Sequence, residues 1–180
     1  MTATQTTSTY ALDPAHTTAE FVVRHLMISK VRGRFTSVAG TIEVAEGSNV
    51  PTAVDVTIGA DSIDTREPQR DAHLKSADFL EAETYPAITF KSTGTDGSGD
   101  AFKLLGDLTI HGVTRPVVLD ATFEGRTNDP WGNERIGYEA HTKISRKDFG
   151  LEWNLALETG GVVVGDEVKI ELNVEAIARK

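Results

Sequence analysis

Apolar and polar residues alternate along much of this chain with a period of two. Val54, Val56 and Ile58 alternate with polar neighbours, and the same pattern recurs over residues 117–124 and 170–176. Successive side chains of a β-strand point to opposite faces, so this period predicts strands with one dry and one wet face. Such strands are typical of antiparallel sheets, whereas buried parallel strands read as continuous apolar runs. The pattern therefore predicts an all-β chain and disfavours Rossmann and TIM-type folds.

The alternation begins at Thr17. It places Phe21 and Val23 on the buried face of a strand, and Val22 with Arg24 on the wet face. The same reasoning assigns a buried face to each later strand.

Further along, the apolar residues change from odd to even numbers between Phe35 and Val38. A period of two cannot change parity without an inserted residue, so we expect a bulge or sharp bend near Thr36 and Ser37. Two nearby glycines would ease the bend, Gly33 and Gly40.

Clusters of turn-forming residues separate the predicted strands and indicate hairpin loops. They are EGSN at 46–49, DGSGD at 96–100, NDPWG at 128–132 and TGG at 159–161. An antiparallel barrel of about eight strands is just wide enough to be filled by side chains or to hold one elongated apolar ligand.

One segment predicts a helix, over about residues 68–80. Pro68 suits a first helical turn, and Leu74, Phe79 and Leu80 supply a short apolar stripe. Pro86 stops any continuation.

The 180 residues include 18 basic and 27 acidic side chains, a formal net charge of −9. This charge repels phosphate backbones at long range, so nucleic acid is not an expected partner. Cysteine is absent, which excludes a disulfide framework, a thiolate nucleophile and a Cys-based zinc site. Without an internal repeat or a long linker, we expect a disordered tail over residues 1–8 and a single domain over 9–180.

The opening segment MTATQTTSTYAL contains no Lys or Arg and no apolar stretch of signal-peptide length. No later run approaches the ~20 apolar residues of a membrane-spanning helix. We therefore expect a cytoplasmic protein that is not an integral membrane protein.

Two glycine-rich segments superficially resemble functional motifs. GGVVVG at 160–165 lacks the Lys-Ser/Thr ending of a phosphate loop and leads into a predicted strand. DGSGD places a Ser between glycines, but no strand-to-helix elbow follows it. Both segments are interpreted as turns.

The polar residues show no specific catalytic or metal-binding spacing. The five histidines are His16, His25, His73, His111 and His141, and no pair has the i, i+4 spacing of a zincin. We expect no metal site, although distant strands of a barrel can assemble a mononuclear one. Asp71, Asp78, Arg70 and Arg146 could supply acid, base and anion contacts, yet charges near a helix or a barrel rim are commonly structural pairs.

Four groups of segments form an ordered series along nearly the whole chain. The first is LDPAH at 12–16, FVVRHL at 21–26 and VRGRF at 31–35; the second is SIDT at 62–65, RDAHLKSADFL at 70–80 and YPAITF at 85–90. The third is GDLTIHGVTRPV at 106–117, and the fourth is ISRKDFGL at 144–151. Together they resemble the YceI-like family of lipocalin-like, polyisoprenoid-binding proteins.

The resemblance implies an extended, antiparallel, lipocalin-like β-barrel with an apolar tunnel for a long isoprenoid chain. It implies binding without an established catalytic step, no cofactor, and a possible homodimer. Many relatives carry a secretion signal and are periplasmic, and the opening segment of this chain departs from that pattern.

The expected ligand-binding residues are apolar side chains on the buried strand faces. They are Phe21, Val23, Phe35, Ile42, Val54, Val56, Ile58, Ile88, Phe90, Leu108, Val117, Leu119, Ile144, Trp153 and Ile170. The polar candidates near the tunnel mouth are His16, Arg70, His73 and Arg146.

The favoured function is non-catalytic binding, transport or storage of a polyisoprenoid, an isoprenoid quinone or a similar amphiphilic lipid. Two alternatives stay open. One is an enzyme that acts on the head group of an apolar substrate through His16, His73 or Arg146, and the other is a stress-related interaction module with a filled core. A hydrophobic pocket separates ligands that differ by one methylene by only about 1–3 kcal/mol, so the residues do not identify the exact ligand.

Overall fold

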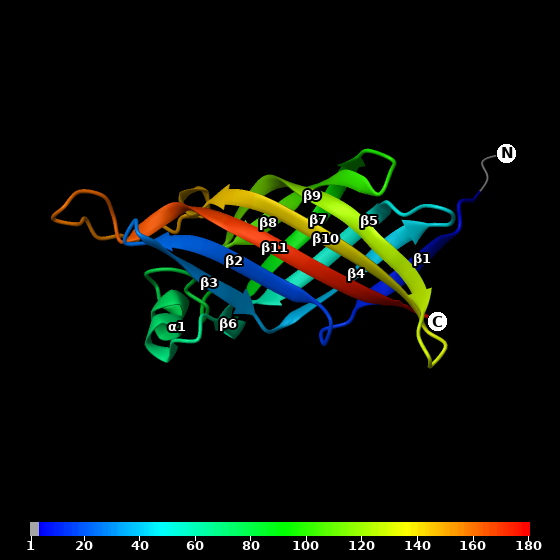
Figure 1. Ribbon diagram of the computed structural model, residues 1–180, viewed down its shortest axis with the longest axis horizontal. Helices are drawn as coiled ribbons and strands as arrows, with labels where there is room; N and C mark the ends of the chain where they lie inside the picture. The colour runs from blue at the N-terminus through cyan, green and yellow to red at the C-terminus, as the bar shows by residue number, and fades with distance from the viewer. Residues whose placement is uncertain (1–3) are drawn as a thin grey trace.

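The computed structural model describes residues 4–180, which form eleven strands, one α-helix and two short 3₁₀ helices (Figure 1). The strands are β1 (Thr7–Leu12), β2 (Thr18–His25), β3 (Ser29–Phe35), β4 (Val38–Ala45), β5 (Pro51–Gly59), β6 (Ile63–Asp64), β7 (Ala87–Asp96), β8 (Ala101–Ile110), β9 (Val113–Asn128), β10 (Glu134–Ser145) and β11 (Val164–Ala178). The helices are η1 (Ala60–Ser62), α1 (Pro68–Lys75) and η2 (Arg146–Phe149). Every strand pairing is antiparallel, which confirms the predicted fold class.

The sheet closes into a barrel because one edge of β11 pairs with both β1 and β2. These two strands act as one long strand that is interrupted at residues 13–17. β3 and β4 form a second interrupted strand beside it, with β3 on β2 and β4 on β1. Counted in this way, and leaving out the two-residue β6, the barrel has eight strands, which agrees with the expected number of about eight.

The predicted change of parity coincides with a bend at Thr36, between the last residue of β3 and the first of β4. The backbone N–H of Ser37 donates to the Oγ of Ser62 at 3.0 Å, so a side chain replaces a bond of the ladder there. The four predicted turns also lie between paired segments. They join β4 to β5, β7 to β8, β9 to β10, and Ala156 to its bridge partner Val162.

Helix α1 begins at Pro68 as predicted but ends at Lys75, before the expected end near residue 80. A carboxylate oxygen of Glu67 accepts a hydrogen bond from the N–H of Gln69 and caps the first turn. At the other end, the Ser76 hydroxyl donates to the carbonyl oxygen of His73 at 2.6 Å. This local bond satisfies a terminal carbonyl and favours the end of the helix.

Two further expectations need correction. The disordered tail was expected to reach residue 8, but β1 begins at Thr7, which pairs with Ala45; residues 1–3 lie outside the described part of the chain. Val22 was assigned to a wet face but is buried. Its cross-strand neighbours are Arg32 and Lys169, and aliphatic stems of such side chains cover apolar surface while their charges stay in water.

The two ends of the barrel differ (Figure 1). One end carries α1, β6 and the β2–β3 hairpin, and we call it the α1 end. The opposite end carries the β4–β5 and β9–β10 hairpins, and we call it the hairpin end. Between them, buried side chains from most strands form one core. Within residues 4–180, no helix combines the length and the apolar character needed to cross a membrane.

Candidate functional site

The barrel encloses a cavity of about 640 Å³ whose wall is made mainly of apolar side chains. This volume lies within the ~300–1,000 Å³ typical of small-molecule sites. Phe21, Phe35, Val56 and Ile58 point inward from the strands yet remain half-buried, because open space rather than packed atoms lies beside them. The hollow interior contradicts the alternative of a filled core.

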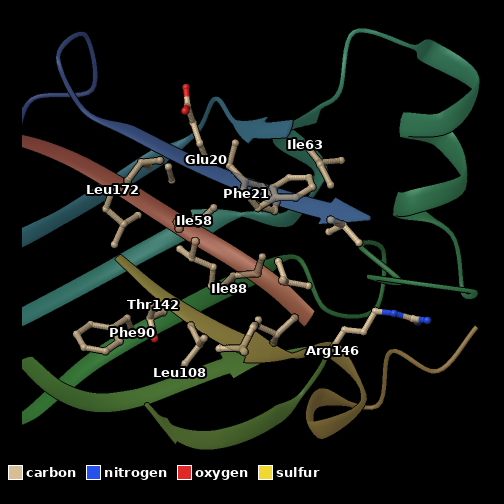
Figure 2. A pocket seen from close by; sticks show the side chains of 18 of the residues that line it. Glu20, Phe21, Ile58, Ile63, Ile88, Phe90, Leu108, Thr142, Arg146 and Leu172 are labelled. Atoms are coloured by element: carbon tan, nitrogen blue, oxygen red, sulfur yellow. The ribbon is translucent and has the colours of Figure 1, made fainter. Parts of the chain in front are cut away.

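The structure places all fifteen apolar residues of the predicted tunnel on the wall of this cavity. Figure 2 shows Phe21, Ile58, Ile88 and Leu108 gathered on the inside of the strands. By contrast, the carboxylate of Glu20 points away from them. Contact of the fifteen residues with a ligand stays a prediction.

Sequence reasoning missed several lining residues. Leu172 and Val174 line the cavity and continue the alternation of Ile170, so the period-two pattern could have identified them. Phe79 and Leu80 reach the cavity from the turn after α1. Both residues were predicted to belong to the apolar stripe of a helix, but a turn has no period of two that would assign them to the cavity wall.

Aromatic side chains pack at the hairpin end of the cavity. Tyr138 makes edge contacts with Phe102 and Phe123, with ring centroids 6.1 and 5.5 Å apart. Its hydroxyl donates to the carbonyl oxygen of Asn49 at 2.7 Å, and burial raises the pKa of Tyr138. The phenol therefore presents its ring to the cavity while a backbone acceptor satisfies its polar atom.

A second aromatic cluster lies at the α1 end. His73, Phe79 and Trp153 pack on one another, with ring centroids 4.7–5.3 Å apart. This cluster joins α1 and the turn after it to the segment between η2 and β11. All three residues line the cavity, so they form part of its cover.

Arg146 lies on the cavity wall and is buried, with 3% of its surface exposed. Its guanidinium donates to four backbone carbonyls, those of Leu151, Trp153, Val164 and Gly165, at 2.6, 2.9, 3.3 and 2.9 Å. Figure 2 shows the guanidinium turned away from the apolar side chains. Burial lowers the pKa of Arg146, and Asp166 opposes that shift. The arrangement fixes the chain around the cavity end and does not direct the charge toward a ligand.

The polar groups of α1 are also engaged with protein partners. Arg70 donates from Nε to the hydroxyl of Thr65 at 2.8 Å and from a terminal nitrogen to the Thr65 carbonyl at 2.7 Å. His73 Nε2 lies 2.9 Å from a carboxylate oxygen of Asp78. Both Arg70 and His73 line the cavity at this end.

His16 lies elsewhere: it is exposed and does not belong to the described cavity wall. Its Nδ1 lies 2.7 Å from Asp13, and both residues gather with Glu175 in a group that could hold a metal. The guanidinium of Arg135, however, lies 2.8 Å from both carboxylates and also binds Asp129. An arginine thus supplies the positive charge here, which favours a structural ion-pair network over a metal site.

The chain has close relatives in sequence. The family model of the YceI-like domain matches residues 10–176. Protein YceI of Escherichia coli O157:H7 is 39% identical over 165 residues, which cover 92% of this chain and 83% of that protein.

Solved structures share the barrel. The YCEI protein of Campylobacter jejuni is 32% identical and has a TM-score of 0.74. The match covers 87% of this chain and 90% of that one. A polyisoprenoid binding domain from Saccharophagus degradans, implicated in plant cell wall breakdown, has a TM-score of 0.72 and covers 94% of this chain and 98% of that one. At 18% identity, this second likeness concerns the fold alone. From the family match, the sequence identity and the shared barrel, we conclude that this chain belongs to the YceI family.

Proposed function

We propose that this protein binds one long, apolar, polyisoprenoid-type lipid in the barrel cavity. The observation that carries the proposal is a cavity of about 640 Å³ whose wall is made mainly of apolar side chains. Within residues 4–180, no buried side-chain nitrogen or oxygen lacks a hydrogen-bond partner. A polar ligand would find few partners there, whereas an apolar chain needs none.

The cavity volume limits the length of chain that it can enclose. An apolar cavity of about 150 Å³ holds benzene, so on that scale a cavity of 640 Å³ holds about 25 carbons, or about five isoprene units. Each unit contributes a gross transfer free energy of about 3–4 kcal/mol, at ~0.8 kcal/mol per buried carbon. We expect affinity to rise with chain length and to level off near five units.

We further propose that the binding serves transport or storage and not catalysis. Arg70, His73 and Arg146, the polar candidates on the cavity wall, each bind protein groups. The name of the Saccharophagus degradans domain, which shares the fold, is in keeping with the binding part of the proposal. A product formed from a bound lipid and abolished by His73→Ala would contradict this part of the proposal.

Extraction of the purified protein with organic solvent, followed by mass spectrometry, tests the function. We expect a lipid in near-stoichiometric amount. Ala140→Phe fills part of the cavity and should lower the amount or shorten the chain, whereas Glu139→Phe adds the same ring on the exposed neighbour. Empty extracts, together with failure to shield a fluorescent lipid from water, would refute lipid binding.

The cytoplasmic location and the homodimer stay predictions. Cell fractionation tests the first, and sedimentation equilibrium across a concentration series tests the second. Neither is needed for the binding proposal.

A further inference from the structure

The wall of the barrel contains a seam between β9 and β10. These strands pair from Asn128 and Glu134 only as far as Asp120 and His141. Beyond that point, residues 113–119 of β9 still pair with β8, and residues 142–145 of β10 still pair with β11. Two strands that are each paired on their outer sides therefore separate from one another at the α1 end of the barrel.

The sequence of the seam explains why the ladder stops. Pro116 has no N–H to donate to a neighbouring strand. The carbonyl of Val118 accepts a hydrogen bond from the side-chain hydroxyl of Thr142, at 2.8 Å, in place of a backbone N–H. Toward η2, the Nε of Arg115 donates to the carbonyl oxygen of Asp148 at 3.0 Å. A side-chain hydrogen bond thus closes each end of the seam, the Thr142 bond next to the last ladder pair and the Arg115 bond toward η2.

A groove of about 330 Å³ lies along the seam on the outside of the barrel. Val117, Thr142 and Ile144 line both this groove and the central cavity. At this place only side chains, without a continuous backbone ladder, separate the cavity from solvent. A lipid chain held inside could therefore bring its polar end out through the wall.

The charge of the groove differs from that of the whole chain. Two cations, Arg115 and Lys143, line it against one carboxylate, Asp148, in a chain of net charge −9. Among residues 4–180, no ion pair is formed by Arg115 or Lys143. Guanidinium and ammonium groups are donors that recognise phosphate.

We propose that the β9–β10 seam binds the anionic phosphate head group of a prenyl phosphate whose chain lies in the cavity. This inference rests on the proposed lipid-binding function and specifies the polar end of the ligand. The competing location is the rim that α1 and the β2–β3 hairpin form at the same end of the barrel. There Arg70 makes two hydrogen bonds to Thr65, and Arg146 makes four to backbone carbonyls. In the seam, by contrast, Arg115 donates to Asp148 through Nε alone among the hydrogen bonds of residues 4–180.

Thiol protection locates the head group directly, because the chain has no cysteine. Val118→Cys places a thiol on the seam, where Val118 is 43% exposed, and Ile28→Cys places one in the turn of the β2–β3 hairpin, where Ile28 is 84% exposed. We expect geranylgeranyl phosphate to slow maleimide labelling of Val118→Cys several-fold, geranylgeraniol to slow it less, and neither to affect Ile28→Cys. Protection of Ile28→Cys alone, or equal protection by alcohol and phosphate, would overturn the seam site.

Affinity measurements separate this site from the lipid-binding function itself. The ratio of the dissociation constants of geranylgeraniol and geranylgeranyl phosphate reports the head group alone. Lys143→Glu should lower that ratio about tenfold, as expected for loss of a charge-assisted contact, while the charge-matched Lys30→Glu on the β2–β3 hairpin leaves it unchanged. An unchanged ratio in Lys143→Glu overturns the seam site, whereas absence of binding by both lipids overturns the lipid-binding function.

Discussion

The buried Arg146 offers a quantitative test of how the α1 end is held together. Arg146→Met keeps a long apolar stem of similar length but leaves four backbone carbonyls without their donor. A buried acceptor that loses its partner costs about 1–3 kcal/mol. The variant also no longer has to bury a charged guanidinium, and this gain offsets part of the summed cost of the four unpaired carbonyls. We therefore expect the free energy of unfolding to fall by about 3–4 kcal/mol.

Urea denaturation followed by tryptophan fluorescence measures this loss, and an unchanged m-value would show that the change lies in stability alone. Lys147→Met is the matched control, because the neighbouring Lys147 is exposed and its ion pair within residues 4–180 is with Asp166 at 3.3 Å. A surface pair of this kind contributes about 0–1 kcal/mol. Arg146→Lys keeps the charge but loses the planar fork, and it should fall between the two.

The result that refutes the reasoning is a loss below about 1 kcal/mol for Arg146→Met, because the four hydrogen bonds would then contribute little net stability. Hydrogen exchange gives a local check. We expect the segment that contains Val164 and Gly165 to lose protection in Arg146→Met before the remaining strands do. Uniform loss of protection would assign Arg146 to the global core instead of the α1 end.

The remaining predictions concern glycines and acid pH. Gly40→Ala should destabilise the protein by about 2–4 kcal/mol in urea denaturation, because a Cβ there would collide with the backbone of β5. Gly33→Ala should cost about 1 kcal/mol or less, because its Cβ mainly meets a movable aromatic ring; equal losses at the two sites would contradict this reading. Hydrogen bonds with His16, the larger cause, and with Arg135 lower the pKa of Asp13 to about 2. The ionised Asp13 therefore stabilises the folded protein fully above its usual pKa near 3.9, and this stabilisation is lost as pH falls toward 2. Asp13→Asn should flatten the dependence of unfolding free energy on pH between about 4 and 2, and an unaltered slope would exclude Asp13 as the titrating group.

The strands and their inward faces could be predicted from the sequence because the period of two is a local property of the backbone. Ile58 and Ile88 lie opposite one another on neighbouring strands, and both line the cavity as their parity requires. The bend at Thr36 was predictable for the same reason, since it shifts the apolar set from one parity to the other. Local chemistry also marked Pro68 as a helix start.

Features that depend on distant partners could not be predicted in this way. His16 lies away from the cavity, between β1 and β2, and contacts Asp13, which pairs with Arg135 of the distant strand β10. The end of α1 depends on whether the Ser76 hydroxyl bonds a helical carbonyl or water, and the sequence does not distinguish the two. Pro116 indicates in the sequence that a backbone donor is missing from its strand. Only the structure shows that the pairing with β10 is the one that stops before this residue.

The hollow interior itself has a cause that can be traced to particular residues. Gly33 lies opposite Phe21 on the neighbouring strand, and a Cβ at Gly33 would lie 2.6 Å from the Cε1 of that ring. A Cβ at Gly106 would likewise lie 2.5 Å from the Cε2 of Phe90. Each ring therefore lies over a glycine against the wall instead of extending fully into the centre, in the manner of aromatic side chains that cover strand glycines. Glycine at these two positions thus preserves the volume that an apolar chain would occupy, and this is why Gly33→Ala should impair lipid binding more than it lowers stability.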